Sequence, residues 1–326
     1  MSATAVLPRL IFSPHYDIRL FGLERLHRFD GRKYGRAWRL LRQRFGNRLD
    51  RCWIQPDREV LETELRVVHD PGYLNSLRHS EAIAQALELP ILRYVPAWLV
   101  DRRILRPMRW AAYGTLTAGR AALSCGLAVN LSGGYHHAKR QRGEGFCVYN
   151  DIALAISELR ARHGLAASDV LLYIDLDAHQ GNGVAHIFRD DRQVRIFDQF
   201  NADIYPRHDR QGRSRVDCPI AMPAFTGDRA YLEALTAELP AFIDAARANA
   251  EIRFAIFNAG TDVLRGDPLG GLDLSEEAVR QRDRFVINQL IRRGIPTLML
   301  PSGGYSQASH RLIADSITYI LEQYGE

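Results

Sequence analysis

The sequence lacks the long apolar runs of a membrane protein. Across its 326 residues, no uninterrupted apolar stretch approaches the roughly eighteen residues that a membrane-spanning helix needs. The residues from Met1 to Pro8 also lack the basic start and the longer apolar stretch of a secretory signal peptide. We therefore expect neither a membrane span nor a signal peptide.

Cysteine and lysine are both scarce. Lysine occurs only as Lys33 and Lys139, so arginine supplies nearly all of the positive charge behind a net charge of +5. Between Arg19 and Arg58, twelve basic residues stand against four acidic ones, but no nucleic-acid-binding motif accompanies them, and we expect a solvated helix face. The cysteines show no paired spacing, which favours reduced thiols and a cytoplasmic protein over a disulfide framework. They are Cys52, Cys125, Cys147 and Cys218.

No internal repeat, linker or low-complexity stretch divides the chain. With 46% hydrophobic residues it has ample material for a core, and short apolar runs alternate with amphipathic stretches along its length. This alternation predicts an α/β fold over residues 1–326, a single domain with a mainly parallel central sheet flanked by helices. We expect strands at residues 10–12, 127–129, 170–172, 194–197, 254–257 and 297–300, helices at 34–45, 109–124, 150–163, 231–250, 275–292 and 311–323, and no regular element at 90–107.

Polar residues gather at the end of one predicted strand. The apolar run at residues 170–172 reads as a buried parallel strand, and Asp175, Asp177 and His179 follow it closely. In open α/β sheets, ligands bind at the carboxyl ends of the strands. Asp177 and His179 are two residues apart, so their side chains share one face of an extended backbone and suit zinc or another divalent metal. The alternative is a helix-capping aspartate followed by a histidine in a turn.

Three further strand ends carry functional groups. The pair His136–His137 follows a Gly-Gly turn, and adjacent neutral imidazoles are poor core material because each needs its own partners. They suit a site that needs a general base and a second, electrostatic imidazole. Asp262 and Tyr305 each follow another apolar strand. Two carboxylates, one imidazole and an open position favour a catalytic over a structural metal site.

These blocks resemble the zinc-dependent histone deacetylase family, which has the arginase/deacetylase fold. The resemblance covers most of the chain and rests on the His-His pair, the Asp-Leu-Asp-x-His run, the Asn-Ala-Gly-x-Asp block with Asp-Pro-Leu-Gly-Gly, and the Gly-Gly-Tyr, all in family order. Residues 22–30 and 302–305 are similar to the class IV branch. The resemblance implies a lysine deacetylase or deacylase that acts on an acyl-lysine protein or peptide.

The residue types match the steps of amide hydrolysis. A zinc ion, or an iron ion, held by Asp177, His179 and Asp262 would activate water and polarise the acyl oxygen. One of the two adjacent histidines would take the proton of the water and later deliver it to the leaving amine. Tyr305 would donate a hydrogen bond to the developing oxyanion.

The resemblance implies further roles around the two histidines. Asp175 would orient His136, and it would also contribute to a potassium site with the backbone carbonyls of Asp177 and His179 and with Asp198 nearby. Asn182 would face His137, where class I enzymes have an aspartate. An amide can orient an imidazole without adding negative charge, although Asn182 also suits the cap of the helix that follows.

The resemblance also implies a narrow tunnel for an acylated lysyl stem. Its lining would be Gly145, Phe146, Tyr205, Leu269 and Gly304. Tyr205 stands where phenylalanine is commoner in the family, which leaves the polarity of that wall open. The acyl group that the tunnel accepts and the oligomeric state are not readable from the sequence.

Three other functions share parts of this residue pattern. Ureohydrolases share the fold, but their binuclear manganese site needs carboxylates at the positions of Gly181 and Leu264, so a single metal is expected here. An acetylpolyamine amidohydrolase would use the same chemistry on a small acylated amine. A non-catalytic protein that binds acyl-lysine is disfavoured, because all of the expected catalytic residues are present.

Overall fold

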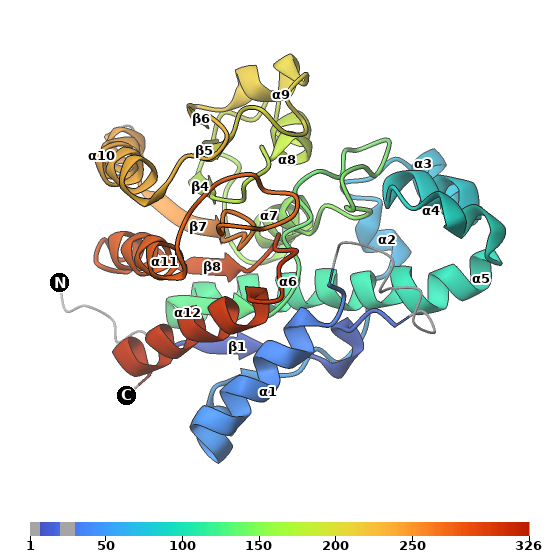
Figure 1. Ribbon diagram of the computed structural model, residues 1–326, viewed down its shortest axis with the longest axis horizontal. Helices are drawn as coiled ribbons and strands as arrows, with labels where there is room; N and C mark the ends of the chain where they lie inside the picture. Colours follow the sequence, from blue (N-terminus) through green and yellow to red (C-terminus); the bar gives the residue numbers. More distant parts are fainter. Residues whose placement is uncertain (1–6, 20–29, 249, 326) are drawn as a thin grey trace.

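The computed structural model describes residues 7–19, 30–248 and 250–325, and a parallel sheet lies at its centre. The strands are β1 (Arg9–Ile11), β2 (Trp53–Ile54), β3 (Leu127–Asn130), β4 (Val170–Asp175), β5 (Val194–Asn201), β6 (Cys218–Met222), β7 (Ile252–Asn258) and β8 (Thr297–Leu300). Their order is β2-β1-β3-β8-β7-β4-β5-β6, and each neighbouring pair is parallel (Figure 1). The predicted α/β fold with a parallel central sheet is therefore confirmed.

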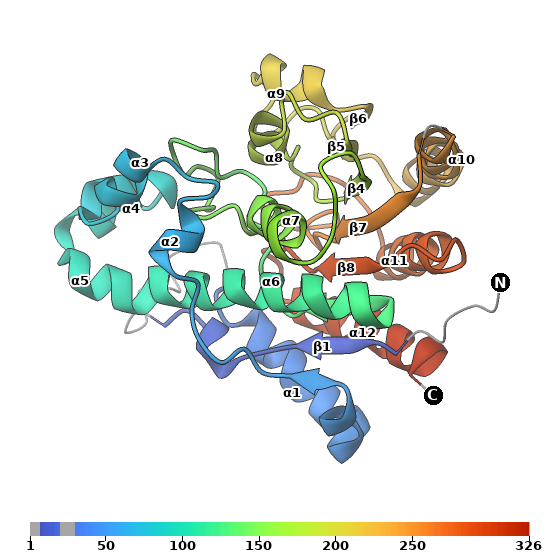
Figure 2. The same cartoon turned by 180° about the vertical axis from the view of Figure 1, so that it is seen from behind.

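Helices cover both faces of this sheet. They are α1 (Lys33–Phe45), α2 (Glu62–Leu65), α3 (Pro71–Ser76), α4 (Ser80–Ala86), α5 (Ala97–Val100), α6 (Arg106–Cys125), α7 (Asp151–Arg162), α8 (Asn182–Ile187), α9 (Arg210–Arg215), α10 (Asp228–Arg247), α11 (Glu276–Ile291) and α12 (Ser309–Tyr324). Figure 1 looks onto the face covered by α1, α12, α11 and α10. Figure 2 looks from behind onto α6 and α7, with the short helices α2 to α5 grouped at one end of α6.

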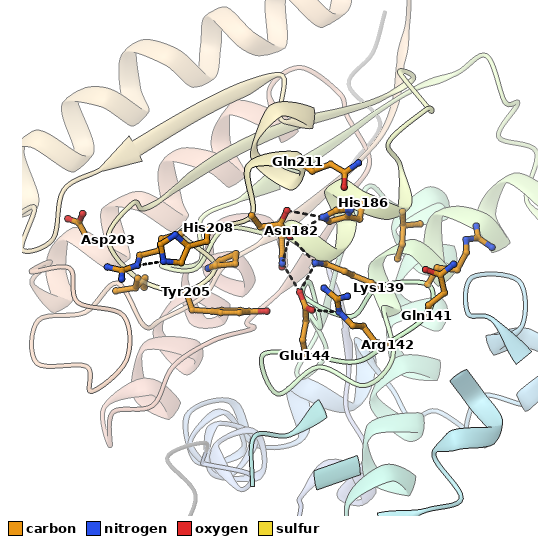
Figure 3. A pocket seen from close by; sticks show the side chains of 16 residues that line it. Lys139, Gln141, Arg142, Glu144, Asn182, His186, Asp203, Tyr205, His208 and Gln211 are labelled. Carbon is orange, nitrogen blue, oxygen red and sulfur yellow. Dashed lines mark hydrogen bonds and ion pairs between the residues drawn. The ribbon is translucent and has the colours of Figure 1, made fainter. Parts of the chain in front are cut away.

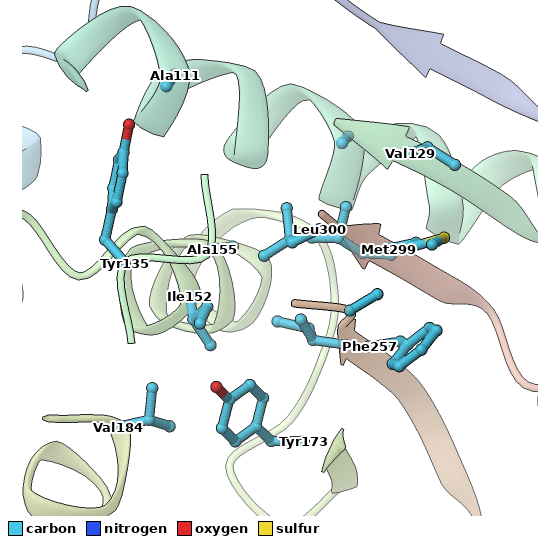
Figure 4. Packing of buried hydrophobic residues seen from close by; sticks show 14 of the residues in the cluster. Ala111, Val129, Tyr135, Ile152, Ala155, Tyr173, Val184, Phe257, Met299 and Leu300 are labelled. Atoms are coloured by element: carbon cyan, nitrogen blue, oxygen red, sulfur yellow. The ribbon is translucent and has the colours of Figure 1, made fainter. Parts of the chain in front are cut away.

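One part of the hydrophobic core lies where α6 and α7 meet the central strands. Every residue of β3, β4 and β8 is buried, as expected for parallel strands that are covered on both faces. Figure 4 shows Ile152 and Ala155 of α7 in the same buried cluster as Leu300 of β8 and Tyr173 of β4. This close packing holds the carboxyl ends of the central strands in fixed positions.

The short elements differ from the sequence-based expectation. The two-residue strand β2 and the edge strand β6 were not predicted, and β6 contains Pro219, which a sheet tolerates at its edge. Residues 90–107 were expected to lack regular structure, but they form short helical turns and the start of α6. Pro90 occupies the first position of a 3-10 turn, where its missing N–H costs no hydrogen bond. Pro107 lies just after a π-helical turn at residues 101–105, which runs without a break into α6.

The order of the strands brings the predicted site residues to one edge of the sheet. The chain passes from β3 to β4 and only later fills the positions between them with β7 and β8. The carboxyl ends of β3, β8, β7 and β4 therefore lie in a row, and ligands of open α/β sheets bind at such a point.

Two observations bear on the absences in the sequence. Over residues 7–19, 30–248 and 250–325, no helix is both long and apolar enough to cross a membrane. All four cysteines are free thiols.

Residues 22–29, which carry most of the N-terminal block similar to class IV, lie outside the described residues.

Candidate active site

The three expected metal ligands converge at the carboxyl ends of β4 and β7. Asp177 and His179 lie in the loop after β4, and Asp262 lies in the loop after the neighbouring β7. Nδ1 of His179 is 3.1 Å from Oδ1 of Asp177 and 2.9 Å from Oδ2 of Asp262. The three ligand atoms lie within 4.8 Å of one another. In the described part of the chain, no other group of three or more histidine, cysteine, aspartate or glutamate side chains meets in this way.

The other carboxylate oxygens of this cluster are held by hydrogen bonds. Oδ2 of Asp177 accepts from the N–H of Gly303 and from the hydroxyl of Ser302, both at 2.9 Å. Oδ1 of Asp262 accepts from the N–H of Ala178 at 2.9 Å. Each carboxylate therefore keeps one oxygen toward the centre of the cluster, where it can bind a shared ion.

The charges of this cluster fit a metal cation. Burial and the charge of Asp177 raise the pKa of Asp262 to about 7. Burial disfavours a charged imidazole at His179, but the hydrogen bonds to Asp177 and Asp262 outweigh that effect and raise the pKa of His179 to about 10. Two buried carboxylates thus require positive charge between them, and their oxygens together with an imidazole nitrogen suit zinc or iron.

The two adjacent histidines face different partners. Nδ1 of His136 lies 2.8 Å from Oδ2 of Asp175, and Nδ1 of His137 lies 2.8 Å from Oδ1 of Asn182. Burial lowers the pKa of a histidine, but Asp175 and Asp177 outweigh it at His136 and raise that pKa to about 9. Burial and the charge of His136 hold the pKa of His137 well below its usual range. Near pH 7 one imidazole is therefore charged and the other is neutral.

Glycines and a buried aspartate shape the turn that presents this pair. Gly133 and Gly134 have φ values of +85° and +79°, which favour glycine. Asp151, in the first turn of α7, accepts hydrogen bonds from the N–H of Gly134 at 2.9 Å and of Tyr135 at 2.8 Å. A Cβ at Gly133 would lie 2.3 Å from this carboxylate. Asp151 was not identified from the sequence, where it reads only as an acidic residue at the start of a helix.

Aromatic rings surround the approach to the metal ligands. The ring of Tyr305 lies 6.1 Å from the ring of His179 and 5.9 Å from that of Phe146. The ring of Tyr205 lies 5.0 Å from that of His137, nearly perpendicular to it. Burial and the nearby carboxylates raise the pKa of Tyr305 well above its usual range. Its phenol therefore keeps its proton and can donate a hydrogen bond.

Two of the expected tunnel residues have a left-handed backbone. Gly145 has a φ of +56° and Phe146 a φ of +65°. A Cβ at Gly145 would lie 2.4 Å from Cδ2 of His137 and 3.0 Å from Cε1 of Tyr205, so only glycine fits between these rings. The phenol of Tyr205 interacts with Glu144, and burial together with that carboxylate raises the pKa of Tyr205.

Asp267 joins the loops that carry the remaining expected tunnel residues, Leu269 and Gly304. Oδ1 of Asp267 accepts from the N–H of Leu269 at 3.0 Å, and Oδ2 accepts from the N–H of Tyr305 at 2.8 Å. The carboxylate therefore links the backbone of the phenol-bearing loop to the loop after β7. No role for Asp267 was predicted from the sequence.

Lys33 is a buried cation that sequence reasoning missed. Its Nζ donates to the carbonyl oxygens of Ser302 at 2.5 Å and Gly304 at 3.2 Å. Burial lowers its pKa to about 8. The one available signal was its rarity, because the chain has only one other lysine.

Arg282 is a second buried cation behind the metal ligands. Its guanidinium donates to the carbonyl oxygens of Leu176 at 2.9 Å and Gly260 at 2.6 Å, which directly precede the loops with Asp177 and Asp262. Its position in the middle of α11 gave no sign of this contact. Arg282 therefore holds both ligand-bearing segments from the side of the sheet.

Two of the residues expected at the potassium site also lie together. Asp175 of β4 is paired in register with Asp198 of β5, and both are fully buried. Burial and the charge of Asp175 raise the pKa of Asp198 well above its usual range. Within the described residues, Oδ1 of Asp198 has no hydrogen-bond partner. A buried oxygen without a partner beside a second carboxylate fits a monovalent cation.

Comparisons with known proteins agree with this geometry. The family model described as "Histone deacetylase domain" matches residues 27–321. The chain is 39% identical over 314 residues to histone deacetylase 2 of Arabidopsis thaliana, a match that covers 96% of this chain and 79% of that protein. It is 32% identical over 241 residues to acetoin utilization protein AcuC of Bacillus subtilis (strain 168), a match that covers 69% of this chain and 59% of that protein. The crystal structure of the HDA15 HD domain has the same fold, with a TM-score of 0.71 at 21% identity over 98% of this chain and 91% of that one.

Proposed function

Because this chain belongs to the histone deacetylase family, we propose that it hydrolyses acyl-lysine amides with a single bound divalent metal ion. The observation that carries the proposal is the meeting of three ligand side chains with the histidine pair at one edge of the sheet. Zinc is the proposed ion and iron the alternative, because the ligands are two carboxylates and one imidazole.

The reaction divides among the side chains of the site. A metal ion held by Asp177, His179 and Asp262 would act as a Lewis acid that acidifies water and polarises the acyl carbonyl. Neutral His137 takes the proton of the attacking water and later gives it to the departing lysine amine. His136, kept charged by Asp175, stabilises negative charge near the carbonyl.

Tyr305 and the aromatic walls complete the proposed roles. The protonated phenol of Tyr305 donates a hydrogen bond to the developing oxyanion. Phe146 and Tyr205 form the walls for the lysyl stem, with Phe146 beside Tyr305 and Tyr205 beside His137. Gly145 leaves room for the rings of Tyr205 and His137 to lie this close. The tip of Tyr205 interacts with Glu144, which leaves the ring itself to face the stem.

Several finer assignments belong to the same proposal. A single metal is favoured because Gly181 and Leu264 supply no further ligands, unlike the binuclear site of ureohydrolases. A potassium ion is proposed beside Asp175 and Asp198, on the evidence of the unpartnered oxygen. We also propose a place in the class IV branch, on residues 302–305, and with it acyl chains longer than acetyl.

A substrate panel tests the function. Purified, zinc-loaded protein is assayed on lysine peptides with acyl groups of increasing length and, in parallel, on N-acetylated polyamines. Faster turnover of acyl-lysine peptides supports the proposal, and the preferred chain length tests the class IV assignment. Faster turnover of the polyamines would replace it with a small-molecule amidohydrolase. Binding of acyl-lysine without turnover would show a non-catalytic protein.

A further inference from the structure

The amide of Asn182 lies between a catalytic histidine and two carboxylates. Its Oδ1 is 2.8 Å from Nδ1 of His137. Its Nδ2 is 2.7 Å from Oε1 of Glu144 and 3.0 Å from Oδ2 of Asp209. Asn182 is buried, so these contacts decide how the amide is oriented. Glu144, Asn182 and Tyr205 all line a cavity of about 1110 Å³. Figure 3 shows the side chains of Glu144 and Asn182 facing each other next to Lys139.

Both carboxylates are held in the ionised form. Nζ of Lys139 lies 2.9 Å from Oε1 of Glu144 and 2.8 Å from Oδ2 of Asp209. Burial opposes ionisation of Glu144, but Lys139 and Arg142 outweigh it and hold the pKa of Glu144 below its usual range. Burial likewise opposes ionisation of Asp209, and hydrogen bonds from Lys139 and from the N–H of Gly212 hold its pKa well below the usual range. An ionised carboxylate can only accept hydrogen bonds.

This arrangement leaves one orientation for the amide. The NH₂ group of Asn182 must face the two acceptors, so its carbonyl oxygen must face His137. A carbonyl oxygen accepts only, and therefore Nδ1 of His137 must carry the proton. In a neutral imidazole the lone pair then lies on Nε2, the nitrogen that a general base needs free. A flipped amide would place its NH₂ against Nδ1 and move the imidazole proton to Nε2.

We infer that Glu144 and Asp209 are positioning residues that fix the tautomer of His137 through Asn182. The inference rests on the proposed function, because it concerns the same general base. His136 needs no such positioning residues, since both oxygens of Asp175 can accept a hydrogen bond from its Nδ1. Glu144 and Asp209 come from separate loops and hold the same amide nitrogen, so either one alone is enough to disfavour the flip.

A set of four variants tests this redundancy. The first three are Glu144→Gln, Asp209→Asn and their combination, which keep the side-chain shapes, and asparagine can still cap α9 at position 209. Each single variant should lower kcat only a fewfold. The double variant should lower kcat at least about tenfold further than the product of the two single effects. Its KM should change little, because the variant loses general-base catalysis and keeps substrate binding. The fourth variant adds Asn182→Asp to the double change and should restore kcat, since a carboxylate has no flipped state.

The tautomer itself is the decisive measurement. Nitrogen NMR shifts of the His137 imidazole, assigned with His137→Gln and recorded without substrate, should show a proton on Nδ1 in the wild type and a gain of the Nε2–H form in the double variant. Asp203→Asn is the matched control, because Asp203 lines the same cavity and bonds the N–H of Ala224 instead of Asn182. It should leave the tautomer unchanged.

Two outcomes would overturn the inference. One is a wild-type His137 that carries its proton on Nε2, a result that needs no variant to fold. The other is a double variant that keeps the Nδ1–H tautomer and shows only the product of the two single losses. A wild-type protein that hydrolyses no acyl-lysine but has the proton on Nδ1 would instead contradict the proposed function and leave the positioning role standing.

Discussion

The backbone N–H of Gly303 donates a hydrogen bond of 2.9 Å to Oδ2 of Asp177. The loop after β8 thus closes directly over Asp177, the proposed metal ligand that follows β4. The contact leaves no room for a side chain, because a Cβ at Gly303 would lie 2.3 Å from Oδ2 of Asp177 and 2.5 Å from Oδ2 of Asp262. The positions of the Asp177 and Asp262 carboxylates therefore require a glycine at position 303.

Gly303→Ala should weaken metal binding although it changes no ligand. The added methyl group must displace Asp177 or Asp262, and we expect a loss of metal affinity on the order of ten- to a hundredfold, as for other disturbances of the residues that support metal ligands. Competition with a chelator measures this affinity. Gly227→Ala is the control, since its Cβ would meet nothing closer than 3.9 Å. Equal metal affinity in the two variants would show that the loop after β8 can shift to make room for the methyl group without displacing the ligands.

Asp262→Ala should remove the metal and the activity together. It deletes one of three ligands from a buried site, while the sheet that carries the residue is covered on both faces. Elemental analysis should find about one metal ion per wild-type chain and almost none in the variant, with unchanged far-ultraviolet circular dichroism. Two metal ions per active wild-type chain would refute the mononuclear site.

Tyr305→Phe should lower kcat on the order of a hundredfold and leave the metal content unchanged. The substitution removes the hydroxyl that donates to the oxyanion, and it keeps the ring that lies against Phe146 and His179. Steady-state kinetics and elemental analysis of the same preparation provide the measurement. Near-normal turnover would mean that another group stabilises the oxyanion.

His69 should make the protein less stable as the pH falls from about 6.5 to about 4. Its Nε2 accepts from the N–H of Asn150 at 2.9 Å, and its Nδ1 lies 3.0 Å from the carbonyl oxygen of Lys139, so only a neutral imidazole satisfies both contacts. Burial lowers its pKa to about 4. In that pH range the unfolded chain binds a proton that the folded chain does not, which costs up to about 3 kcal/mol of the free energy of unfolding. Above pH 6.5 the full stability is present.

The comparison variant for this effect is His69→Gln. Glutamine can donate to Lys139 and accept from Asn150, but it does not titrate. Urea unfolding at several pH values in the presence of a chelator should show a steeper loss of stability for the wild type between pH 6.5 and 4 than for the variant. Parallel curves would mean that His69 is protonated in the folded protein as readily as in the unfolded chain.

Most strands of the sheet and the functional residues at their carboxyl ends could be predicted from local patterns in the sequence. Asp177, His179, Asp262 and Tyr305 each follow an apolar run that is long enough to read as a strand, and a parallel sheet brings such strand ends to one edge. Both signals are local, because a few neighbouring residues are enough to recognise a strand and the turn that ends it. The edge strand β6 was not predicted, because its proline and its exposed positions interrupt the apolar pattern of a strand.

The groups that hold these residues in place could be found only from the folded chain. Lys33 bonds to Ser302, 269 positions away, and Asn182 meets Glu144 and Asp209 from separate loops. The family resemblance implied an amide beside His137, but not the two carboxylates behind it, which would repel an aspartate at position 182. Such contacts have no local pattern, because they depend on how separate loops fold over the same strand ends, and burial then gives each of them its strength.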